Sequence, residues 1–371
     1  MELAHQIMIV DTHQDTPYRL KKKAEDISQR TTDGHFDYPR AKQGGLDAVF
    51  MAAYVPPSLE ARGEARRFAD ETIDMIERLT RDHPGQFVLA CSVADIQTQF
   101  GKGPLSIAIG IENGAPLEGD LANLQHFYDR GVRCITLCHS KNNHICDSSF
   151  DTTRKWHGLS PFGKELIPAM NRLGMIVDVS HASDNAFYQV VKLSTAPVVA
   201  THSSCRHFTL GWERNMDDDM IRLLAERGGL IQINFGSIFV STEVNRRFVE
   251  SMKHINAHAA SHQLNGDERD AFAKEYLREH ALGHADVSDV VAHIDHAVRL
   301  VGIDHVGIGS DFDGVSNLPK GLTDVSCYPN LIQELLKRSY SEEEIKKICG
   351  ANFLRIWTTI QKTALALQSN D

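Results

Sequence analysis

The amino-acid sequence predicts an α/β fold: a (β/α)8 TIM barrel with a helical insertion between strands seven and eight. Eight short runs rich in Val, Ile and Ala recur along the chain, and stretches with helical periodicity separate them. This is the pattern of a parallel sheet with helices outside it. The runs are apolar at nearly every position, as expected of strands that are covered on both faces. Eight such strands favour a closed barrel over an open sheet, and 371 residues suffice for one barrel.

The eight predicted strands share β-branched or small apolar residues at their centres. In chain order they are residues 7–11, 48–54, 106–112, 132–137, 175–178, 198–200, 230–234 and 305–310.

Helices are predicted between and after these strands. Residues 58–81 begin at Ser58 after two prolines and distribute apolar side chains among charges, which is the amphipathic pattern of a surface helix. Residues 286–301 carry a stripe of Val, Ile and Ala that we expect to pack on the sheet. Residues 341–344 form a capping box that opens a helix, and residues 353–367 form the last helix.

A long polar stretch, residues 240–284, lies between the seventh and eighth strands and is rich in Glu, Arg and His. We interpret it as a helical insertion at the barrel mouth. The chain has no internal repeat, low-complexity tract or linker rich in Pro, Gly and Ser, so residues 1–371 are predicted to form a single domain.

Composition excludes several classes of protein. Lys and Arg number 39 against 49 Asp and Glu, a formal charge of −10, and the basic residues are scattered, so no nucleic-acid partner is expected. No run of about 18 apolar residues could span a bilayer. Residues 1–10 lack the basic start of a signal peptide, and the seven cysteines form no C-x-x-C pair. We therefore expect reduced thiols and a cytoplasmic protein.

Polar residues follow six of the eight predicted strands. In a barrel of this type the chemistry collects at the carboxyl ends of the strands, so these positions are the candidate site. They are Asp11 to Asp15 after the first strand, Glu112 at the end of the third, His139 after the fourth, Ser180-His181 after the fifth, Thr201-His202 after the sixth and Asp311 to Asp313 after the eighth.

Imidazole and carboxylate groups together are a ligand set that suits Zn²⁺ and similar metals. His13 and Asp15 are two residues apart, so in an extended segment both face the same side and can hold one ion. His181 and His202 can hold a second, and Glu112 can bridge the two. Two metals about 3.5 to 4 Å apart would share a water whose pKa falls to about 7, which supplies a hydroxide nucleophile.

Simpler interpretations exist for each position. Asp15 could cap a helix, Glu112 could belong to a turn, and Asp311 or Asp313 could form an Asx turn before Gly314. The joint placement of six strand ends in one ring favours the metal site.

A second histidine pattern occurs in the insertion. His254, His258 and His262 recur every four residues and would line one helix face, but Ile255 stands where the H-E-x-x-H zinc motif needs Glu. A solvated face is favoured over a structural metal there. His293 and His296, beside the apolar stripe of their helix, are predicted to be structural.

Several motifs resemble, in order, those of the membrane dipeptidase family, also called renal dipeptidase-like. They cover nearly the whole chain, and the set is far more specific than any one tetrapeptide. The matching segments are residues 11–15 (DTHQD), 110–114 (GIENG), 178–181 (DVSH), 201–204 (THSS), 214–218 (RNMDD), 307–314 (GIGSDFDG) and 350–355 (GANFLR).

The resemblance implies a zinc dipeptidase of the amidohydrolase superfamily, with two zinc ions per chain and a metal-bridging hydroxide. It implies that His13 and Asp15 bind one zinc, that His181 and His202 bind the other, and that Glu112 bridges the two ions. Three further roles follow from it: His139 contacts the scissile carbonyl, Arg214 clasps the free carboxylate of the substrate and Asp311 carries the proton. The resemblance also implies a dipeptide as the substrate, L-Xaa-D-Xaa dipeptides included, and a homodimer, whereas no membrane anchor is expected in this sequence.

Two alternatives remain at this point. One is an amidohydrolase that acts on N-acyl amino acids or lactones, and the other is a non-catalytic barrel relative used as a binding module. The complete set of predicted ligands, together with Asp311, favours an enzyme.

Overall fold

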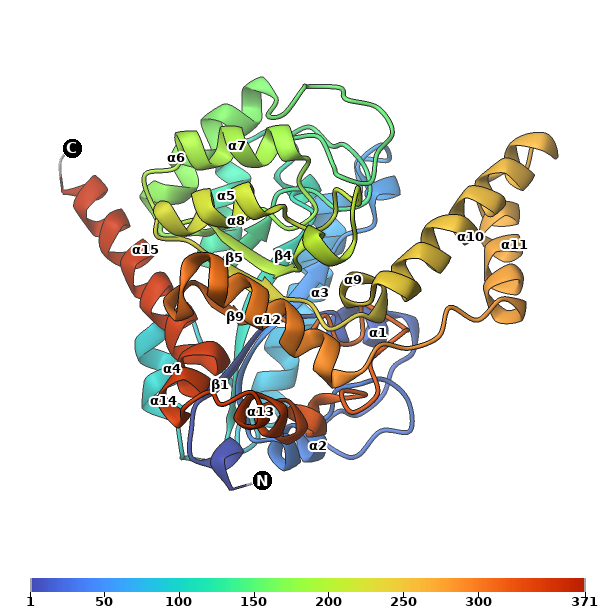
Figure 1. The fold of residues 1–371 in the computed structure, drawn as a ribbon. Coiled ribbons are helices and arrows are strands. Elements are labelled where there is room, and N and C mark those ends of the chain that lie inside the picture. The colour runs from blue at the N-terminus through green and yellow to red at the C-terminus, as the bar shows by residue number, and fades with distance from the viewer. Residues whose placement is uncertain (1, 370–371) are drawn as a thin grey trace.

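The computed structural model describes residues 2–369 and has the predicted fold, a nearly closed barrel of eight parallel strands with helices around it (Figure 1). Around the barrel the order is β1-β2-β4-β5-β6-β7-β8-β9, and a bridge between Gln14 and Phe312 links its two ends. The barrel strands are β1 (Ile9–Gln14), β2 (Leu46–Tyr54), β4 (Leu105–Glu112), β5 (Val132–Thr136), β6 (Ile176–Asp178), β7 (Val199–Ser203), β8 (Leu230–Ile233) and β9 (Val306–Ile308).

The α-helices mostly follow the strands and cover the outside of the barrel (Figure 1). They are α1 (Thr16–Lys22), α2 (Tyr38–Gly44), α3 (Ala65–Asp82), α4 (Val93–Gln99), α5 (Leu121–Asp129), α6 (Pro161–Leu173), α7 (Asp184–Leu193), α8 (Asp218–Glu226), α9 (Ser237–Val240), α10 (Thr242–Ser261), α11 (Gly266–Glu279), α12 (Val287–Val301), α13 (Tyr328–Lys337), α14 (Glu342–Lys346) and α15 (Asn352–Gln368). The predicted capping box at Ser341 is confirmed at the start of α14.

Strand β4 shows how the sequence positions the site. Its isoleucines, Ile107, Ile109 and Ile111, belong to the core between strands and helices, whereas Ala108 belongs to a separate core. Because side chains alternate along a strand, Gly110 and Glu112 lie on the same face as Ala108. Ala108 and Gly110 are small, so Glu112, at the carboxyl end of the strand, lies at the top of the barrel interior.

The opposite end of the barrel is closed by α15. Phe353 and Trp357 of this helix contact Phe50 of β2 edge to face, with ring centroids 5.2 and 5.3 Å apart. All three side chains are at most 2% exposed, so one end of the barrel is sealed by packed aromatic rings. The barrel interior opens at the other end, where Glu112 lines a cavity.

Two local predictions were wrong, and one short strand was not predicted. The first strand is shifted to Ile9–Gln14, a short strand β3 (Phe87–Leu89) pairs with β4 outside the barrel, and the helix expected from Ser58 begins at Ala65. A 3-10 turn, Pro57–Leu59, precedes that helix, and Gly63 has φ +65, a conformation that glycine adopts easily and that interrupts a helix.

The predicted insertion between the seventh and eighth barrel strands is a helical hairpin. Helices α10 and α11 project from the barrel at one side of its mouth (Figure 1). Within residues 2–369, no helix combines the length and the apolar character needed to cross a membrane.

Candidate metal centre

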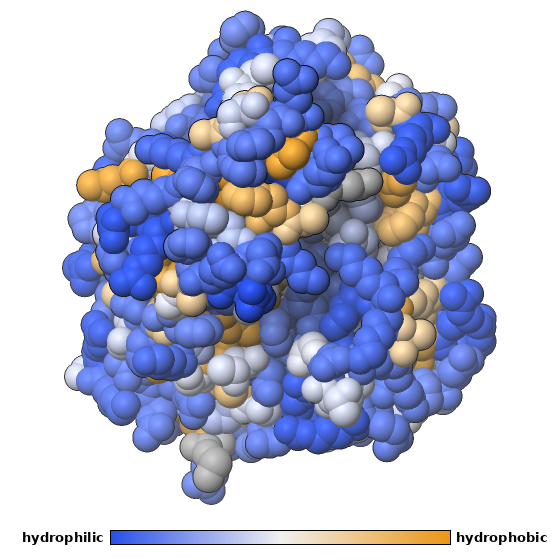
Figure 2. All heavy atoms as spheres, turned by 90° about the vertical axis from the view of Figure 1, so that its right-hand side faces the viewer, coloured by the Kyte–Doolittle hydropathy of each residue, from blue (hydrophilic) through white to orange (hydrophobic). Residues whose placement is uncertain are grey.

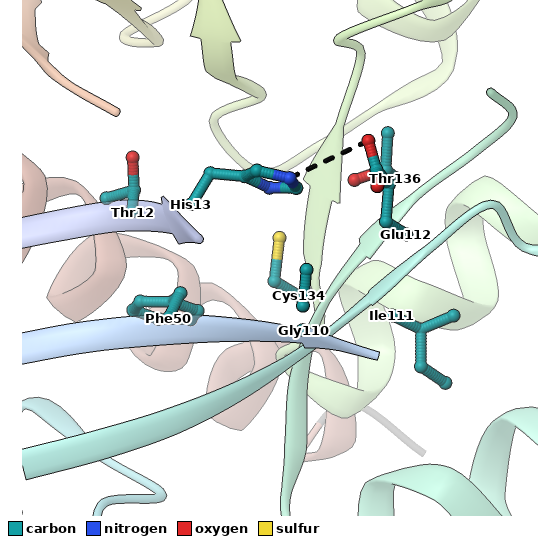
Figure 3. Close-up of a pocket in the computed structure, with 9 residues that line it drawn as sticks. Thr12, His13, Phe50, Gly110, Ile111, Glu112, Cys134 and Thr136 are labelled. Atoms are coloured by element: carbon teal, nitrogen blue, oxygen red, sulfur yellow. Dashed lines mark ion pairs between the residues drawn. The ribbon is translucent and has the colours of Figure 1, made fainter. Parts of the chain in front are cut away.

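Glu112 lies at the centre of the predicted site. Its Oε1 atom is 3.1 Å from Nε2 of His181, 3.4 Å from Nε2 of His202, 3.6 Å from Nε2 of His13 and 3.8 Å from Nε2 of His139. Figure 3 shows His13 of β1 facing Glu112 of β4 across the barrel interior. Side chains from four different barrel strands and their following loops thus converge on one carboxylate.

The end of β1 supplies His13 and Asp15. The pairing of β1 with β2 shifts register between Asp11 and Gln14, an irregularity of the kind that re-aims side chains. Asp15 occupies the N-cap position of α1 but makes no capping hydrogen bond. Its Oδ2 atom instead lies 3.4 Å from Nε2 of His13, so the capping interpretation does not account for this carboxylate.

The His202 ring is held by a chain of hydrogen bonds from β7 to β6. The Thr201 hydroxyl donates to Oδ2 of Asp178 at 2.6 Å and lies 2.8 Å from Nδ1 of His202. Because the single hydroxyl proton goes to the carboxylate, Nδ1 of His202 must donate to the Thr201 oxygen. The lone pair of His202 is then on Nε2, which faces Glu112, as required of a metal ligand.

The donor set fits a divalent cation. In this tautomer Nε2 of His202 is an acceptor that faces a second acceptor, Glu112 Oε1. Nε2 of His181 lies 3.0 Å from that of His202, so at most one of these two nitrogens carries a proton. Four buried polar atoms at the site have no hydrogen-bond partner: Nε2 of His13, Oδ1 of Asp15, Nδ1 of His139 and Nδ1 of His181. Crowded acceptors of this kind are stabilised when cations lie between them.

Burial and the close packing of charged groups shift the pKa values of Glu112 and of three histidines of the site. Burial raises the pKa of Glu112 well above its usual range, and Asp15 adds to the effect. Burial lowers the pKa of His13, but Glu112 and Asp15 more than offset this and raise it to about 10. Burial, with Arg214, lowers the pKa of His181 well below its usual range, and burial with His13 does the same for His202. These two imidazoles are neutral at physiological pH and available as ligands.

The structure does not divide the residues into the two predicted pairs. The groups whose ligand atoms come close enough to share one ion are His13, Glu112 and His202, then Glu112, His139 and His181, and then His13, Asp15 and Asp311. The His13 and His202 rings also stack, with centroids 3.7 Å apart. All five predicted ligands therefore lie in one cluster, which His139 and Asp311 border.

Asp311 is a buried carboxylate beside this cluster. It has a positive φ of 62, a conformation that non-glycine residues rarely adopt, and its Oδ2 atom accepts a hydrogen bond from Asn234 at 2.7 Å. Burial raises its pKa to about 7, with His13 opposing that shift. Burial lowers the pKa of His139 to about 3, so this imidazole is neutral and can donate one hydrogen bond.

Arg214 is a buried cation beside Nε2 of His181, the nitrogen that faces Glu112. Its guanidinium donates to the Ser203 hydroxyl at 3.1 Å and to the His202 carbonyl at 2.9 Å, and it lies 3.1 Å from Nε2 of His181. The side chain makes no ion pair within residues 2–369, and its Nε has no partner. Burial lowers its pKa to about 10. A buried guanidinium without a carboxylate partner is costly, which suits a residue that receives an anionic ligand.

Two neighbouring carboxylates have structural roles. Asp11 accepts hydrogen bonds from Ser310, Gln14 and the Tyr328 hydroxyl, and Asp313 accepts from Thr16, Arg19 and the His35 amide. They join the first and last barrel strands and their loops, and neither belongs to the cluster around Glu112.

Three polar residues that support the site were given no specific role by the sequence. They are Asp178, Thr201 and Asn234, which hold His202 and Asp311. The available signals were their positions near the carboxyl ends of barrel strands and, for Asp178 and Thr201, their places in the segments 178–181 and 201–204 that resemble the family motifs.

The cluster opens into a cavity of about 1010 Å³. Asp15, Glu112, His139, His181 and Asp311 line its inner end. Much of its wall is aromatic or apolar, formed by Phe150, Trp212, Phe239, Phe248, Val249, Met252 and Val315. Phe248, Val249 and Met252 belong to α10 of the projecting hairpin. Figure 2, which views the molecule from the side of the hairpin, shows a hollowed area bordered by hydrophobic side chains.

Comparison with known proteins places this geometry in context. The family model for membrane dipeptidase (peptidase family M19) matches residues 1–371. The crystal structure of the probable dipeptidase PvdM from Pseudomonas aeruginosa is 29% identical, with a TM-score of 0.88 over 98% of both chains. A metallopeptidase from Rhodobacter sphaeroides, liganded with a phosphinate mimic of the dipeptide L-Ala-D-Ala, is 25% identical, with a TM-score of 0.78 over 95% of this chain and 99% of the other. An amidohydrolase from Pseudomonas aeruginosa, 20% identical with a TM-score of 0.74 over 97% and 98%, shares the fold.

Proposed function

Because this chain belongs to the membrane dipeptidase family, peptidase family M19, we propose that it is a zinc-dependent dipeptidase with two zinc ions at the barrel mouth. In this proposal His13 and Asp15 hold one ion, His181 and His202 hold the other, and Glu112 bridges them. Dipeptides are the substrates, and those with a D-residue at the carboxyl end are included because the Rhodobacter sphaeroides relative binds a mimic of L-Ala-D-Ala.

The observation that carries the proposal is the arrangement around Glu112. Four imidazoles lie within 4 Å of one of its oxygens, and a buried guanidinium without a carboxylate partner lies beside Nε2 of one of them, His181. The first feature suits cations and the second suits a substrate carboxylate. Together they support hydrolysis of a small acidic-ended substrate.

When bound, two zinc ions supply Lewis acidity and a water that is deprotonated near neutral pH. The residues of the chain provide the rest. Asp311, held by Asn234 beside His13 and Asp15, accepts the proton of the attacking water and delivers it to the leaving amine. His139 donates a hydrogen bond to the carbonyl oxygen as negative charge develops there.

Arg214 would determine substrate length. A guanidinium forms two parallel hydrogen bonds with a carboxylate, and the position of Arg214 next to His181 keeps that carboxylate near the carbonyl that is cleaved. A substrate must therefore present a free carboxylate one residue after the scissile bond, as a dipeptide does. The large apolar cavity leaves room for bulky side chains.

A kinetic screen tests the proposal directly. The purified chain is loaded with zinc, its metal content is measured, and a dipeptide library that includes every combination of L and D residues is assayed. We expect two zinc ions at the barrel mouth and turnover of dipeptides. Metal-loaded protein that cleaves none of the L-L and L-D dipeptides would exclude this function.

Replacement of Arg214 by Met is expected to impair only substrates with a free carboxylate. Loss of a buried charge pair costs about 2–4 kcal/mol, which corresponds to a decrease in kcat/KM of about 30-fold to 10³-fold. Each dipeptide is compared with its carboxyl-terminal amide, for which the variant and the wild type should be equal. An equal loss for both substrates would favour an enzyme that acts on other acyl compounds, such as lactones.

Replacement of Thr201 by Val removes the group that orients His202. The ring then loses its Nδ1 partner while the ligand itself stays, so zinc affinity should fall by about 10-fold to 100-fold, as for other supporting groups of metal ligands. Competition with a chromophoric chelator measures this affinity. Thr72→Val is the matched control, because Thr72 is also buried but bonds only to Phe68 in α3.

A further inference from the structure

A second group of metal-binding side chains lies outside the barrel mouth. His207, Asp218 and His296 place one ligand atom each within 4.8 Å of one another. They come from three elements: the 3-10 turn Arg206–Phe208, the first residue of α8, and α12. None of them belongs to the cluster around Glu112.

Two members of this group are already positioned. Nε2 of His296 lies 2.8 Å from Oδ1 of Asp218, and His296 is 8% exposed. Two ligands of one tetrahedral zinc, at bond lengths of about 2.0–2.2 Å, are about 3.3–3.6 Å apart, so these two atoms need to separate by only about 0.5–0.8 Å to admit the ion. Asp218 lies in the first turn of α8 and His296 in the middle of α12, so both side chains are held by regular structure.

The third member is free to complete the site. The His207 side chain is exposed, and its ring nitrogens have no hydrogen-bond partner within residues 2–369. Its ring stacks on His296 with centroids 4.3 Å apart and planes inclined by 21°. A metal must lie in the plane of each ring that binds it, so His207 turns about its side-chain bonds while the other two ligands shift only slightly.

The neighbouring histidine and cation do not compete for this role. His293 is occupied on both nitrogens, since Nδ1 accepts from the Cys205 amide and Nε2 donates to the Val240 carbonyl. Arg206 is paired with Asp184 at 2.6 Å and lies 3.7 Å from Asp217. Its positive charge is therefore compensated by carboxylates other than Asp218.

We propose that His207, Asp218 and His296 form a peripheral divalent-metal site, with a ligand set suited to zinc, that ties the loop 204–217 to α12. This loop carries Arg214, and its two ends are joined by hydrogen bonds from Arg206 to Met216 and from Met216 to Ser204. A metal bound by His207 and Asp218 would fix the loop near both of its ends, and His296 would hold it against α12. The effect of this loop on substrate binding rests on the function proposed for Arg214, whereas the metal site does not.

Zinc stoichiometry tests the site without reference to activity. Wild type, His207→Ala and His262→Ala are stripped with a chelator and equilibrated at one fixed free-zinc concentration, and zinc per chain is measured by mass spectrometry. His262 is the matched control, because it is exposed and stacks on His258 at 4.0 Å in a similar way. We expect one zinc fewer in His207→Ala and no change in His262→Ala. Equal zinc in His207→Ala and wild type would overturn the site, whatever number the barrel mouth holds.

Hydrogen exchange tests the tie itself. Zinc should slow the exchange of backbone amides in residues 205–217 of the wild type, and the slowing should be smaller in His207→Ala. Both proteins keep the barrel-mouth residues, so a general effect of zinc there is common to them. An identical zinc effect in the two proteins would show that the metal does not hold the loop.

Discussion

Glu112→Gln is expected to lose the zinc of the barrel mouth and, with it, turnover. Glu112 contributes the negative charge on which four imidazoles converge, and a neutral amide of the same shape would place an N–H or a weaker acceptor at that point. We expect kcat/KM to fall by about 10³-fold or more, because the loss combines metal binding with the stabilisation of transition-state charge. Zinc content and kinetics measured on the same preparation check this.

The matched control is Glu71→Gln, an exposed carboxylate on α3 that pairs with Lys21 at 3.2 Å. It should keep full zinc content and activity. Glu112 is buried in a crowded site with a raised pKa, so the variant should also unfold at no lower temperature than the metal-free wild type. Full zinc occupancy in Glu112→Gln would rule out a bridging role for this residue.

Asp311→Asn is expected to keep zinc but lose most turnover. An asparagine preserves the shape and can still accept the hydrogen bond from Asn234, but it cannot accept a proton. Loss of a positioned general acid–base typically lowers the rate by about 10²-fold to 10⁴-fold. We expect this decrease in kcat while zinc content and the midpoint of thermal unfolding stay close to those of the wild type.

The metal content of this variant separates two roles. Asp311 lies close enough to His13 and Asp15 to share an ion with them, so it could act as a ligand instead of a proton carrier. Loss of one zinc in Asp311→Asn would assign it to the metal, and unchanged turnover would remove it from the reaction. Because the two zinc-content outcomes differ by a whole ion per chain, one measurement distinguishes them.

Some parts of the fold could not be predicted because their signals are weak or misleading. β3 has only three residues, Phe87–Leu89, and lies outside the barrel. Three apolar residues are too few for their hydrophobic pattern to distinguish a strand from a loop. The start of α3 was placed too early because the two prolines before Ser58 resemble a helix start, whereas the turn at Gly63 interrupts the helix. Both errors concern local competition between turns and regular structure, which a sequence pattern does not settle.

By itself, the sequence determined the barrel and the residues available at its mouth. Strand and helix periods are local properties, and the carboxyl ends of parallel strands meet at one end of a barrel, so Glu112, His181 and His202 could be grouped before any coordinates. Their order along the chain also carried the resemblance to the family that the whole-chain match confirms.

Only the tertiary structure decided which atoms meet. Closure of the barrel, the register shift at His13 and the positive φ values of His181 and Asp311 set distances between residues that lie up to about 300 positions apart in the chain. These features place Glu112 at the centre of the cluster and Arg214 next to Nε2 of His181, and they bring His207 next to α12. Such contacts depend on how many elements pack at once, so no single segment of the sequence encodes them.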